Sequence, residues 1–205
     1  MADRSAAVPA PAIEKNALFV CAPGAGGHMN DAQMLRTAAA LEPLGIEVVR
    51  FDFAHRERGS RRPDPMPQLR ERFEAVVADA RKKLDNRPLI IGGRSMGGRV
   101  ATMLAADGYA CDALLLFAYP LHPAGQPEKL RDAHLPRIRV PVLCFNGTRD
   151  ALCRRELMER ALQSVTAPWR MHWLEGADHS LKGEKVMNEM AATVADWLSG
   201  LTIVR

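Results

Sequence analysis

The sequence predicts an α/β protein in which a mostly parallel sheet of about six strands carries helices on both faces. Two observations favour this class. Short apolar runs alternate with amphipathic segments from residue 16 to the end of the 205-residue chain. The apolar runs lack the polar alternation of half-exposed strands, as parallel strands covered on both faces do. Residues 1–14 are rich in Ala and Pro, so we expect a flexible leader at 1–15. Because no repeat or second domain is visible, we expect a single domain at 16–205.

The expected strands and helices alternate along the chain, except between 112–118 and 140–145. The expected strands are 17–22, 46–53, 88–92, 112–118, 140–145 and 168–174, and the expected helices are 30–44, 68–85, 97–106, 153–165 and 183–199. Asn30 is expected to cap the first helix with Gln33 three residues on, and Gly45 to end it. The segment 119–139 is Pro-rich and has little periodicity, so we expect an irregular connection there.

Composition excludes several classes of protein. An apolar share of 47% and a charged share of 25% are ordinary for a globular chain, and a net charge of +4 is too small to predict a nucleic acid partner. No apolar run reaches the length of about 18 residues that spans a membrane, so no membrane partner is expected. The four cysteines have no paired spacing and the N-terminus has no continuous apolar core. Reduced thiols and a cytoplasmic location are therefore expected.

The strongest chemical signal is the G-x-S-x-G sequence at 93–97, centred on Ser95. A buried strand precedes it and an Ala-rich helix follows it, which is the strand–turn–helix setting of a nucleophile elbow. Such a turn is so tight that the positions two before and two after the serine must be small, and both are glycine here. We predict that Ser95 is a nucleophile.

A serine nucleophile needs a base, and His179 is the best candidate among six histidines. It follows the last expected strand on a glycine turn, in keeping with the chain order serine, acid, histidine. His28 and His55 precede the serine, and His122 leaves no suitable acid between itself and Ser95. We therefore predict that His179 takes the serine proton.

The acid that orients the histidine should follow a strand between residues 95 and 179. Asp150 comes shortly after the strand expected at 140–145 and is the preferred candidate. Asp132, on the Pro-rich connection, is the second choice. Asp178 is adjacent to His179, so its carboxylate can hardly turn back to the ring.

The oxyanion of acyl transfer needs two backbone donors. The elbow supplies the N–H of Met96, and the Gly-rich loop 23–28 after the first strand should supply the N–H of Ala25, with Gly24 as the alternative. The same loop is not a phosphate cradle, since no Lys-Ser/Thr follows it, and no cofactor is expected.

Four segments carry a resemblance to a known family. They are GGRSMGGR at 92–99, YPLHP at 119–123, PEKLR at 127–131 and GTRD at 147–150. The chain resembles the α/β-hydrolase superfamily, and more narrowly a group of small predicted hydrolases related to dienelactone hydrolase, which includes a subunit of the nonspecific lethal chromatin complex. The resemblance implies a triad of Ser95, Asp150 and His179. Dienelactone hydrolases have a cysteine where this chain has Ser95, so their substrate is not carried over.

The sequence therefore predicts a serine hydrolase that cleaves a small-molecule ester or thioester through a covalent acyl-enzyme. The alternative, suggested by the chromatin-complex relative, is a non-catalytic binding or scaffold protein on the same fold. A metal enzyme built on His28, His55 and His122 is a third hypothesis, disfavoured because H-x-H and H-E-x-x-H spacings are missing. No metal is expected, and the oligomeric state stays open.

Two further expectations concern the substrate. Gly24, His28, His122 and Arg62 are candidate substrate contacts. The arginines at 56–62 form a cluster that we expect to be a solvated loop, with the alternative that it favours an anionic substrate at the site. The connection 119–139 holds four prolines, so it should form at most one or two short turns and no large lid. We expect an open cleft and a preference for short acyl groups.

Overall fold

The computed structural model describes residues 17–84 and 86–201, so the expected leader lies outside the described residues. The expected sheet of six strands is confirmed, and every pairing is parallel, in the order β2-β1-β3-β4-β5-β6. The strands are β1 (Ala17–Ala22), β2 (Ile46–Arg50), β3 (Leu89–Arg94), β4 (Ala113–Phe117), β5 (Val142–Gly147) and β6 (Trp169–Leu174). Strands β1, β3, β4 and β5 are buried throughout, which explains their continuous apolar runs.

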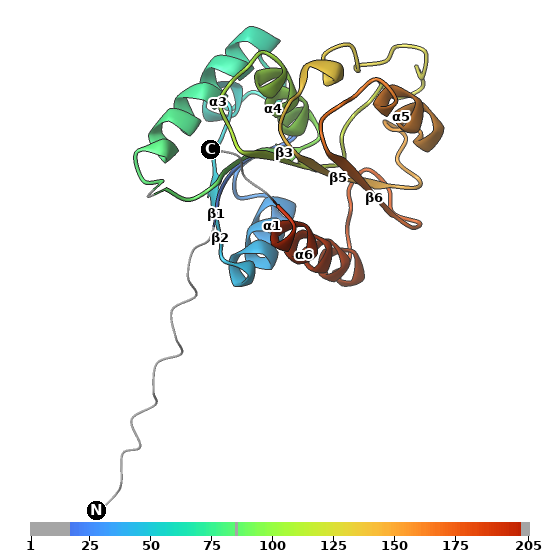
Figure 1. Ribbon diagram of the computed structural model, residues 1–205. Coiled ribbons are helices and arrows are strands. Elements are labelled where there is room, and N and C mark those ends of the chain that lie inside the picture. The colour runs from blue at the N-terminus through green and yellow to red at the C-terminus, as the bar shows by residue number, and fades with distance from the viewer. Residues whose placement is uncertain (1–16, 85, 202–205) are drawn as a thin grey trace, which may run out of the picture.

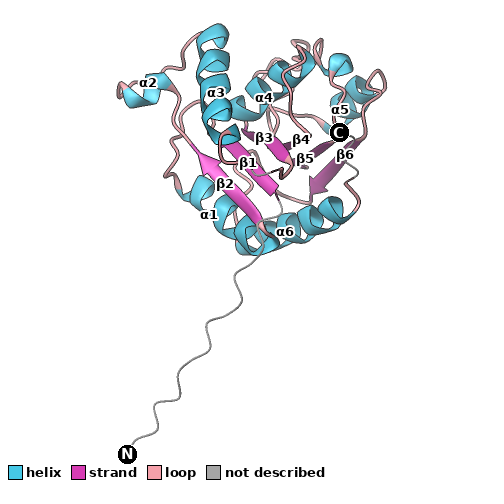
Figure 2. Cartoon of the chain, turned by 60° about the vertical axis from the view of Figure 1, so that its left-hand side comes forward, coloured by secondary structure: helices cyan, strands magenta, loops and turns pink. Residues whose placement is uncertain are grey.

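Helices cover both faces of the sheet, as Figures 1 and 2 show. The helices are α1 (Ala32–Leu41), α2 (Ala54–Glu57), α3 (Met66–Arg81), α4 (Met96–Ala106), α5 (Arg155–Leu162) and α6 (Glu184–Ser199). α1 and α6 lie together on one face, and α3, α4 and α5 lie on the other. Each layer has its own apolar core. One contains Phe73 and Leu104, and the other contains Met34 and Trp197.

The first helix differs from the expected one at both ends. Its N-cap is Asp31 rather than Asn30, and the amide of Gln33 donates to the carbonyls of Ser180 and Leu181 instead of forming a capping box. The α-helix stops at Leu41 because Pro43 has no N–H to continue it, and a 3₁₀ turn, η1 (Glu42–Leu44), completes the segment. Gly45 ends it with a φ of 77°, as predicted.

Other boundaries move by a few residues. β5 begins at Val142 rather than 140 because Pro141 precedes it, and it runs on to Gly147. β3 reaches Arg94, next to the serine, and α3 ends at Arg81, short of the expected 85. The connection 119–139 contains only one short 3₁₀ turn, η2 (Leu135–Arg137), in agreement with the expected lack of a large lid.

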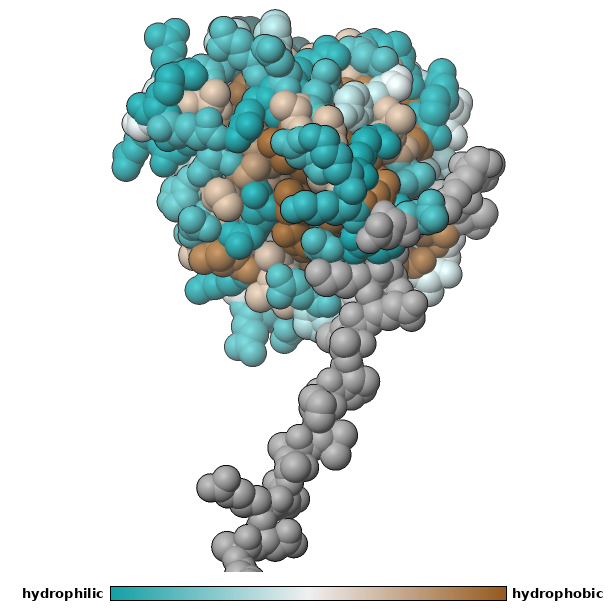
Figure 3. Space-filling view, turned by 90° about the vertical axis from the view of Figure 1, so that its left-hand side faces the viewer, coloured by the Kyte–Doolittle hydropathy of each residue, from teal (hydrophilic) through white to brown (hydrophobic). Residues whose placement is uncertain are grey.

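The surface seen in Figure 3 is mostly hydrophilic, with smaller hydrophobic areas between the polar side chains. Among the described residues, Leu35 in α1 is the one large hydrophobic side chain classed as exposed, at 44%. No helix in the described ranges combines the length and apolar character needed to cross a membrane.

The order of the strands determines where a site can form. The chain passes from β1 outward to β2 and then returns to β3 on the other side of β1, so its direction reverses between β1 and β3. Ligands of open α/β sheets bind beyond the carboxyl ends of the strands at such a point. The loop 23–28 follows β1 and Ser95 follows β3, and both lie at this position.

Candidate active site

Ser95 occupies a sharp turn between β3 and α4, with φ of 47° and ψ of −115°. A residue other than glycine rarely has a positive φ, and such strain concentrates at functional sites. The neighbouring backbone explains the two glycines. A Cβ on Gly93 would lie 2.1 Å from the Ala22 carbonyl oxygen, and one on Gly97 would lie 2.5 Å from the same atom. Strand β1 therefore packs directly against the turn and keeps it tight.

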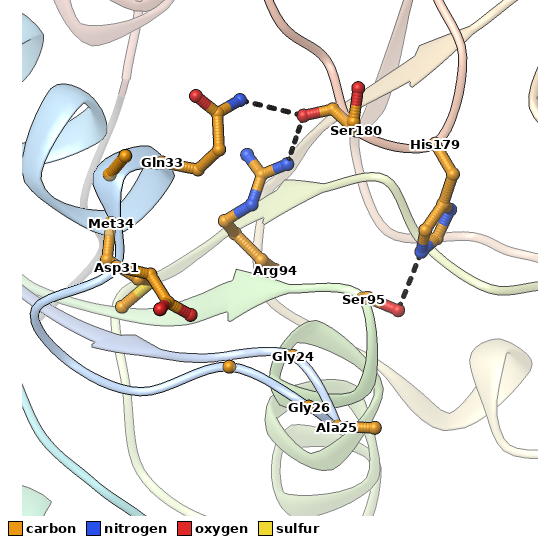
Figure 4. A pocket seen from close by; sticks show the side chains of 12 residues that line it. Gly24, Ala25, Gly26, Asp31, Gln33, Met34, Arg94, Ser95, His179 and Ser180 are labelled. Atoms are coloured by element: carbon orange, nitrogen blue, oxygen red, sulfur yellow. Dashed lines mark hydrogen bonds between the residues drawn. The ribbon is translucent and has the colours of Figure 1, made fainter.

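His179 lies between Ser95 and Asp150 and contacts both. Its Nε2 is 2.8 Å from Ser95 Oγ, the contact drawn in Figure 4, and its Nδ1 is 2.8 Å from Asp150 Oδ2 and 3.0 Å from Oδ1. A carboxylate can only accept hydrogen bonds, so Nδ1 carries the proton and Nε2 is left to accept the serine hydroxyl. The three residues chosen from the sequence thus form one continuous chain of hydrogen bonds.

Asp150 is fixed in a buried position by several donors. Its side chain has no exposed surface, and its oxygens accept hydrogen bonds from the Leu152 backbone N–H at 2.8 Å and from Asn146 Nδ2 at 3.2 Å. A buried carboxylate is costly unless it is fully hydrogen-bonded, and these bonds together with His179 satisfy it. The result is a rigid acceptor facing the imidazole.

Asn146 was missed by the sequence reasoning. It lies in β5, and its amide group bonds both backbone polar atoms of Tyr119 at 3.1 Å as well as Asp150. Its side chain ties the start of the connection after β4 to the acid loop. The signal that could have identified Asn146 is a polar residue at the end of an apolar strand, four positions before Asp150. Its side chain is buried in the structure.

The other two candidate acids lie elsewhere. Asp178 Oδ1 accepts the backbone N–H and the hydroxyl of Ser180 at 2.9 and 2.5 Å. The hydroxyl bond is the main reason that the pKa of Asp178 falls below its usual value. Within the described part of the chain, neither Asp178 nor Asp132 bonds the ring of His179.

The two expected oxyanion donors flank Ser95. Ala25 lies in the loop after β1, and Met96 is the first residue of α4. Among the described residues, neither N–H donates to another backbone or side-chain group, so both are available to a ligand. Gly24 packs close to the serine, since a Cβ built on it would lie 3.6 Å from Ser95 Cβ.

His55 contacts this loop, whereas the sequence suggested it only as a ligand of the disfavoured metal site. It is buried in α2, its ring stacks on Phe53, and its Nε2 is 3.3 Å from the Ala25 carbonyl oxygen. Its Nδ1 lies 3.8 Å from Asp64 Oδ2. Through the Ala25 carbonyl, the imidazole therefore holds the loop that bears the expected oxyanion donor.

Two pockets meet at Ser95 and Ala25. The first, of about 510 Å³, we call the His179 pocket. Its lining includes Gly24, Gly26, Gln33, Arg94, His179 and Ser180, many of them labelled in Figure 4. The second, of about 490 Å³, we call the Arg131 pocket. Its lining includes Met66, Leu69, Met96, Arg99, Pro120, Arg131 and Leu152. The connection 119–139 thus forms one wall of the second pocket rather than leaving that side open.

Arg94 anchors the loop that carries His179. Its Nη2 donates to the Ser180 carbonyl at 2.6 Å, beside the bond from Gln33 to the same oxygen, as Figure 4 shows. Arg94 is 8% exposed, and burial lowers its pKa from the ordinary value. Two side chains from separate elements therefore hold the residue that follows the histidine.

Three of the expected substrate contacts lie away from the pockets, and we do not carry them forward. His122 is buried, with Nδ1 bonded to the Pro123 carbonyl and Nε2 accepting the Arg154 N–H. His28 pairs with Asp31 at 3.0 Å. Arg62 is exposed and lines neither pocket. The fourth, Gly24, does line the His179 pocket.

Two other arginines of the cluster have partners within the protein. Arg58 pairs with Asp64 at 2.6 Å, and Arg56 donates to the Ser60 carbonyl. In residues 17–84 and 86–201, no three His, Cys, Asp or Glu side chains converge as a metal site would require. The four cysteines are free thiols, and three of them are buried.

Comparison with known proteins places this architecture in a family. A family model described as an alpha/beta hydrolase domain matches residues 15–199. An alpha-beta serine hydrolase homologue from Coxiella burnetii is 22% identical with a TM-score of 0.74, over 91% of this chain and 86% of that one.

Two more solved structures have the same fold. An alpha/beta serine hydrolase without a lid from Xanthomonas campestris is 21% identical with a TM-score of 0.73, over 97% and 88% of the two chains. Dienelactone hydrolase from Anabaena variabilis is 18% identical with a TM-score of 0.71, over 93% and 88%.

Proposed function

Because the chain belongs to the alpha/beta hydrolase family, we propose that it is a serine hydrolase that cleaves an ester or a thioester through a covalent acyl-enzyme. The observation that carries the proposal is the chain of hydrogen bonds from Ser95 Oγ through His179 to Asp150, at 2.8 Å for each link. Nucleophile, base and orienting acid are the three roles that acyl transfer by serine requires.

The acylation step follows from this geometry. Ser95 Oγ attacks the carbonyl carbon of the substrate while His179 Nε2 takes the hydroxyl proton. Asp150, holding Nδ1–H, keeps the ring oriented and stabilises the imidazolium that forms. The carbonyl oxygen becomes an oxyanion and accepts the N–H groups of Ala25 and Met96. One such donor contributes about 3–4 kcal/mol to the transition state.

The tetrahedral intermediate then collapses to the acyl-enzyme, and water hydrolyses the acyl-enzyme in a second half-reaction. The bond to the leaving oxygen or sulfur breaks, and His179 Nε2 gives that atom the proton it took from Ser95. A water molecule next loses a proton to Nε2 and attacks the acyl-enzyme. Release of the acid returns the proton to Ser95 Oγ. The imidazole is a base and an acid in turn, and no group is left altered.

Three structural features support a catalytic role over that of a scaffold on the same fold. The backbone strain at Ser95 would serve no purpose in a binding protein. Asp150 and His55 are both buried, and their contacts hold the base and the Ala25 loop in place. Neither side chain is exposed for contact with a partner protein. Substrate-sized pockets adjoin the serine on both sides.

The proposal is tested with 4-nitrophenyl acetate, an uncharged ester whose release of coloured 4-nitrophenolate reports acyl transfer directly. Wild type should hydrolyse it, and Ser95→Ala should show no rate above the uncatalysed background. The variant should unfold at the wild-type temperature, since it loses only a hydroxyl group. Equal rates for the two proteins would contradict the assignment.

A further inference from the structure

Two arginines line the Arg131 pocket without an acidic partner. Arg99 lies in the first turns of α4, and Arg131 lies on the connection after β4. Within the described residues neither makes an ion pair, whereas Arg58, Arg72 and Arg137 all do. Arg99 Nε is buried and has no hydrogen-bond partner, and the Arg131 guanidinium reaches only the Pro120 carbonyl, at 3.5 Å.

The two cations also act on each other. Partial burial, followed by the charge of Arg99, lowers the pKa of Arg131. The one carboxylate that lines this pocket, Asp64, already has Arg58 at 2.6 Å and His55 at 3.8 Å. The pocket therefore has a positive charge that the described protein does not compensate, and an anion entering it would relieve the repulsion.

The connection holds Arg131 in place. The Tyr119 hydroxyl donates to the Arg131 carbonyl at 2.9 Å, and the Arg131 N–H donates to the Leu121 carbonyl at 2.7 Å. Tyr119 is fully buried, so the segment bearing Arg131 is anchored to the core. A fixed cation loses less freedom on binding a ligand than one on a mobile loop.

The chemistry of the serine decides which half of the substrate enters this pocket. His179 must hand its proton to the leaving group, so the leaving group lies on its side of Ser95. His179 lines the first pocket and does not line the Arg131 pocket. The acyl group therefore extends into the Arg131 pocket, where Met66, Leu69 and Leu152 provide apolar walls.

We propose that Arg99 and Arg131 bind a carboxylate at the far end of the acyl group, so that the substrates are half-esters or half-thioesters of short dicarboxylic acids. The inference rests on the proposed function and specifies its substrate class. Hydrolysis adds water across the ester or thioester bond and yields the free dicarboxylic acid and the alcohol or thiol. A carboxylate fits guanidinium groups through paired charge-assisted hydrogen bonds.

The test compares two esters with the same leaving group and the same number of acyl carbons, the 4-nitrophenyl half-ester of adipic acid and 4-nitrophenyl hexanoate. The measured quantity is the ratio of kcat/KM for the charged ester to that for the neutral one, after subtraction of the uncatalysed rate. Wild type should prefer the charged ester by about tenfold or more, the range of a charge-assisted hydrogen bond. Arg99→Met and Arg131→Met should each reduce the ratio by about tenfold, and Arg131→Lys should restore part of it.

Lys129→Met is the matched control. Lys129 is an exposed cation on the same connection and does not line the pocket, so its loss should leave the ratio unchanged. Thermal melts of all variants identify any that fail to fold. If an arginine-to-methionine variant misfolds, the ratio measured for the lysine substitution at the same position takes its place in the comparison. A ratio unaffected by both arginine substitutions would overturn the inference.

The assay also separates this inference from the proposed function. If Ser95→Ala removes hydrolysis of both esters while the arginine substitutions leave the ratio unchanged, only the assignment of the carboxylate site is wrong. If Ser95→Ala hydrolyses both esters like wild type, the serine mechanism itself is wrong. A preference for 4-acetoxybenzoate over its methyl ester, without one for the adipate half-ester, would place the charge on the leaving group and overturn the inference.

Discussion

Asn146 Nδ2 donates a hydrogen bond of 3.2 Å to Asp150 Oδ2, the same oxygen that lies 2.8 Å from His179 Nδ1. Asn146 belongs to the central sheet, and both backbone polar groups of Tyr119 hold its amide. The position of the acid is thus set by strand β5 as well as by its own loop, where the Leu152 N–H also donates to it. By fixing Asp150, this bond places the base His179 precisely for the proposed mechanism.

Asn146→Ala should lower kcat by about tenfold with little change in KM, because the acid loosens while the substrate pockets stay intact. The two Tyr119 groups also lose their partner, so the free energy of unfolding should fall by about 1–3 kcal/mol. Steady-state kinetics and urea unfolding measure the two effects. An unchanged kcat in a folded variant would remove Asn146 from the mechanism.

Asp150→Asn should reduce kcat by at least about 10³-fold, since an amide no longer fixes the proton on His179 Nδ1. Asp178→Asn and Asp132→Asn are the controls and should keep most of the wild-type rate, because neither carboxylate contacts the imidazole ring. The measurement is hydrolysis of 4-nitrophenyl acetate by the three variants. Loss of activity in Asp178→Asn alone would show that the wrong acid has been chosen.

Among neutral 4-nitrophenyl esters, kcat/KM should be highest for short acyl chains. The Arg131 pocket is bounded by a connection that has a single 3₁₀ turn, and Arg99 and Arg131 take part in its lining. Each methylene left in water forgoes about 0.8 kcal/mol of binding. A series from acetate to palmitate tests this, and a maximum at eight carbons or beyond would reveal a long acyl tunnel.

The protein should lose stability as the pH falls from 7 to 5 because of His134. Burial, with the charges of Arg99 and Arg137, lowers the pKa of this histidine to about 4, and its ring lies 2.9 Å from the Thr102 hydroxyl. The unfolded chain takes up the proton near its ordinary pKa of about 6.5, so acid favours unfolding by about 1–2 kcal/mol at pH 5. Urea unfolding should show a smaller loss in His134→Asn, and equal pH dependence would refute the assignment.

The structural features that depend on local sequence patterns were predicted well. The alternation of buried runs and amphipathic segments predicted the sheet, and the motif around Ser95 predicted the turn, because the clash of any Cβ at positions 93 and 97 with β1 leaves glycine as the only choice. The boundaries at Leu41 and Val142 were missed where Pro43 and Pro141 interrupt the pattern.

Contacts between distant segments were beyond the sequence. Gln33 reads as a capping residue, yet its partner is the carbonyl of Ser180, 147 positions away. His122 follows a strand and resembles a site residue, but the fold turns its ring toward Pro123 and Arg154. Arg99 and Arg131 become neighbours only when the connection folds back over α4. Each of these depends on tertiary packing, which periodicity does not encode.

The most direct measurement for the whole account is labelling with a fluorophosphonate, which reacts only with a serine activated by a base. Intact-mass and peptide analysis should show one adduct per chain, located on Ser95, together with complete loss of ester hydrolysis. Asp150→Asn should label far more slowly, because the proposed base is no longer oriented. An unlabelled wild-type protein, or an adduct on a different residue, would contradict the central claim that Ser95 is the nucleophile.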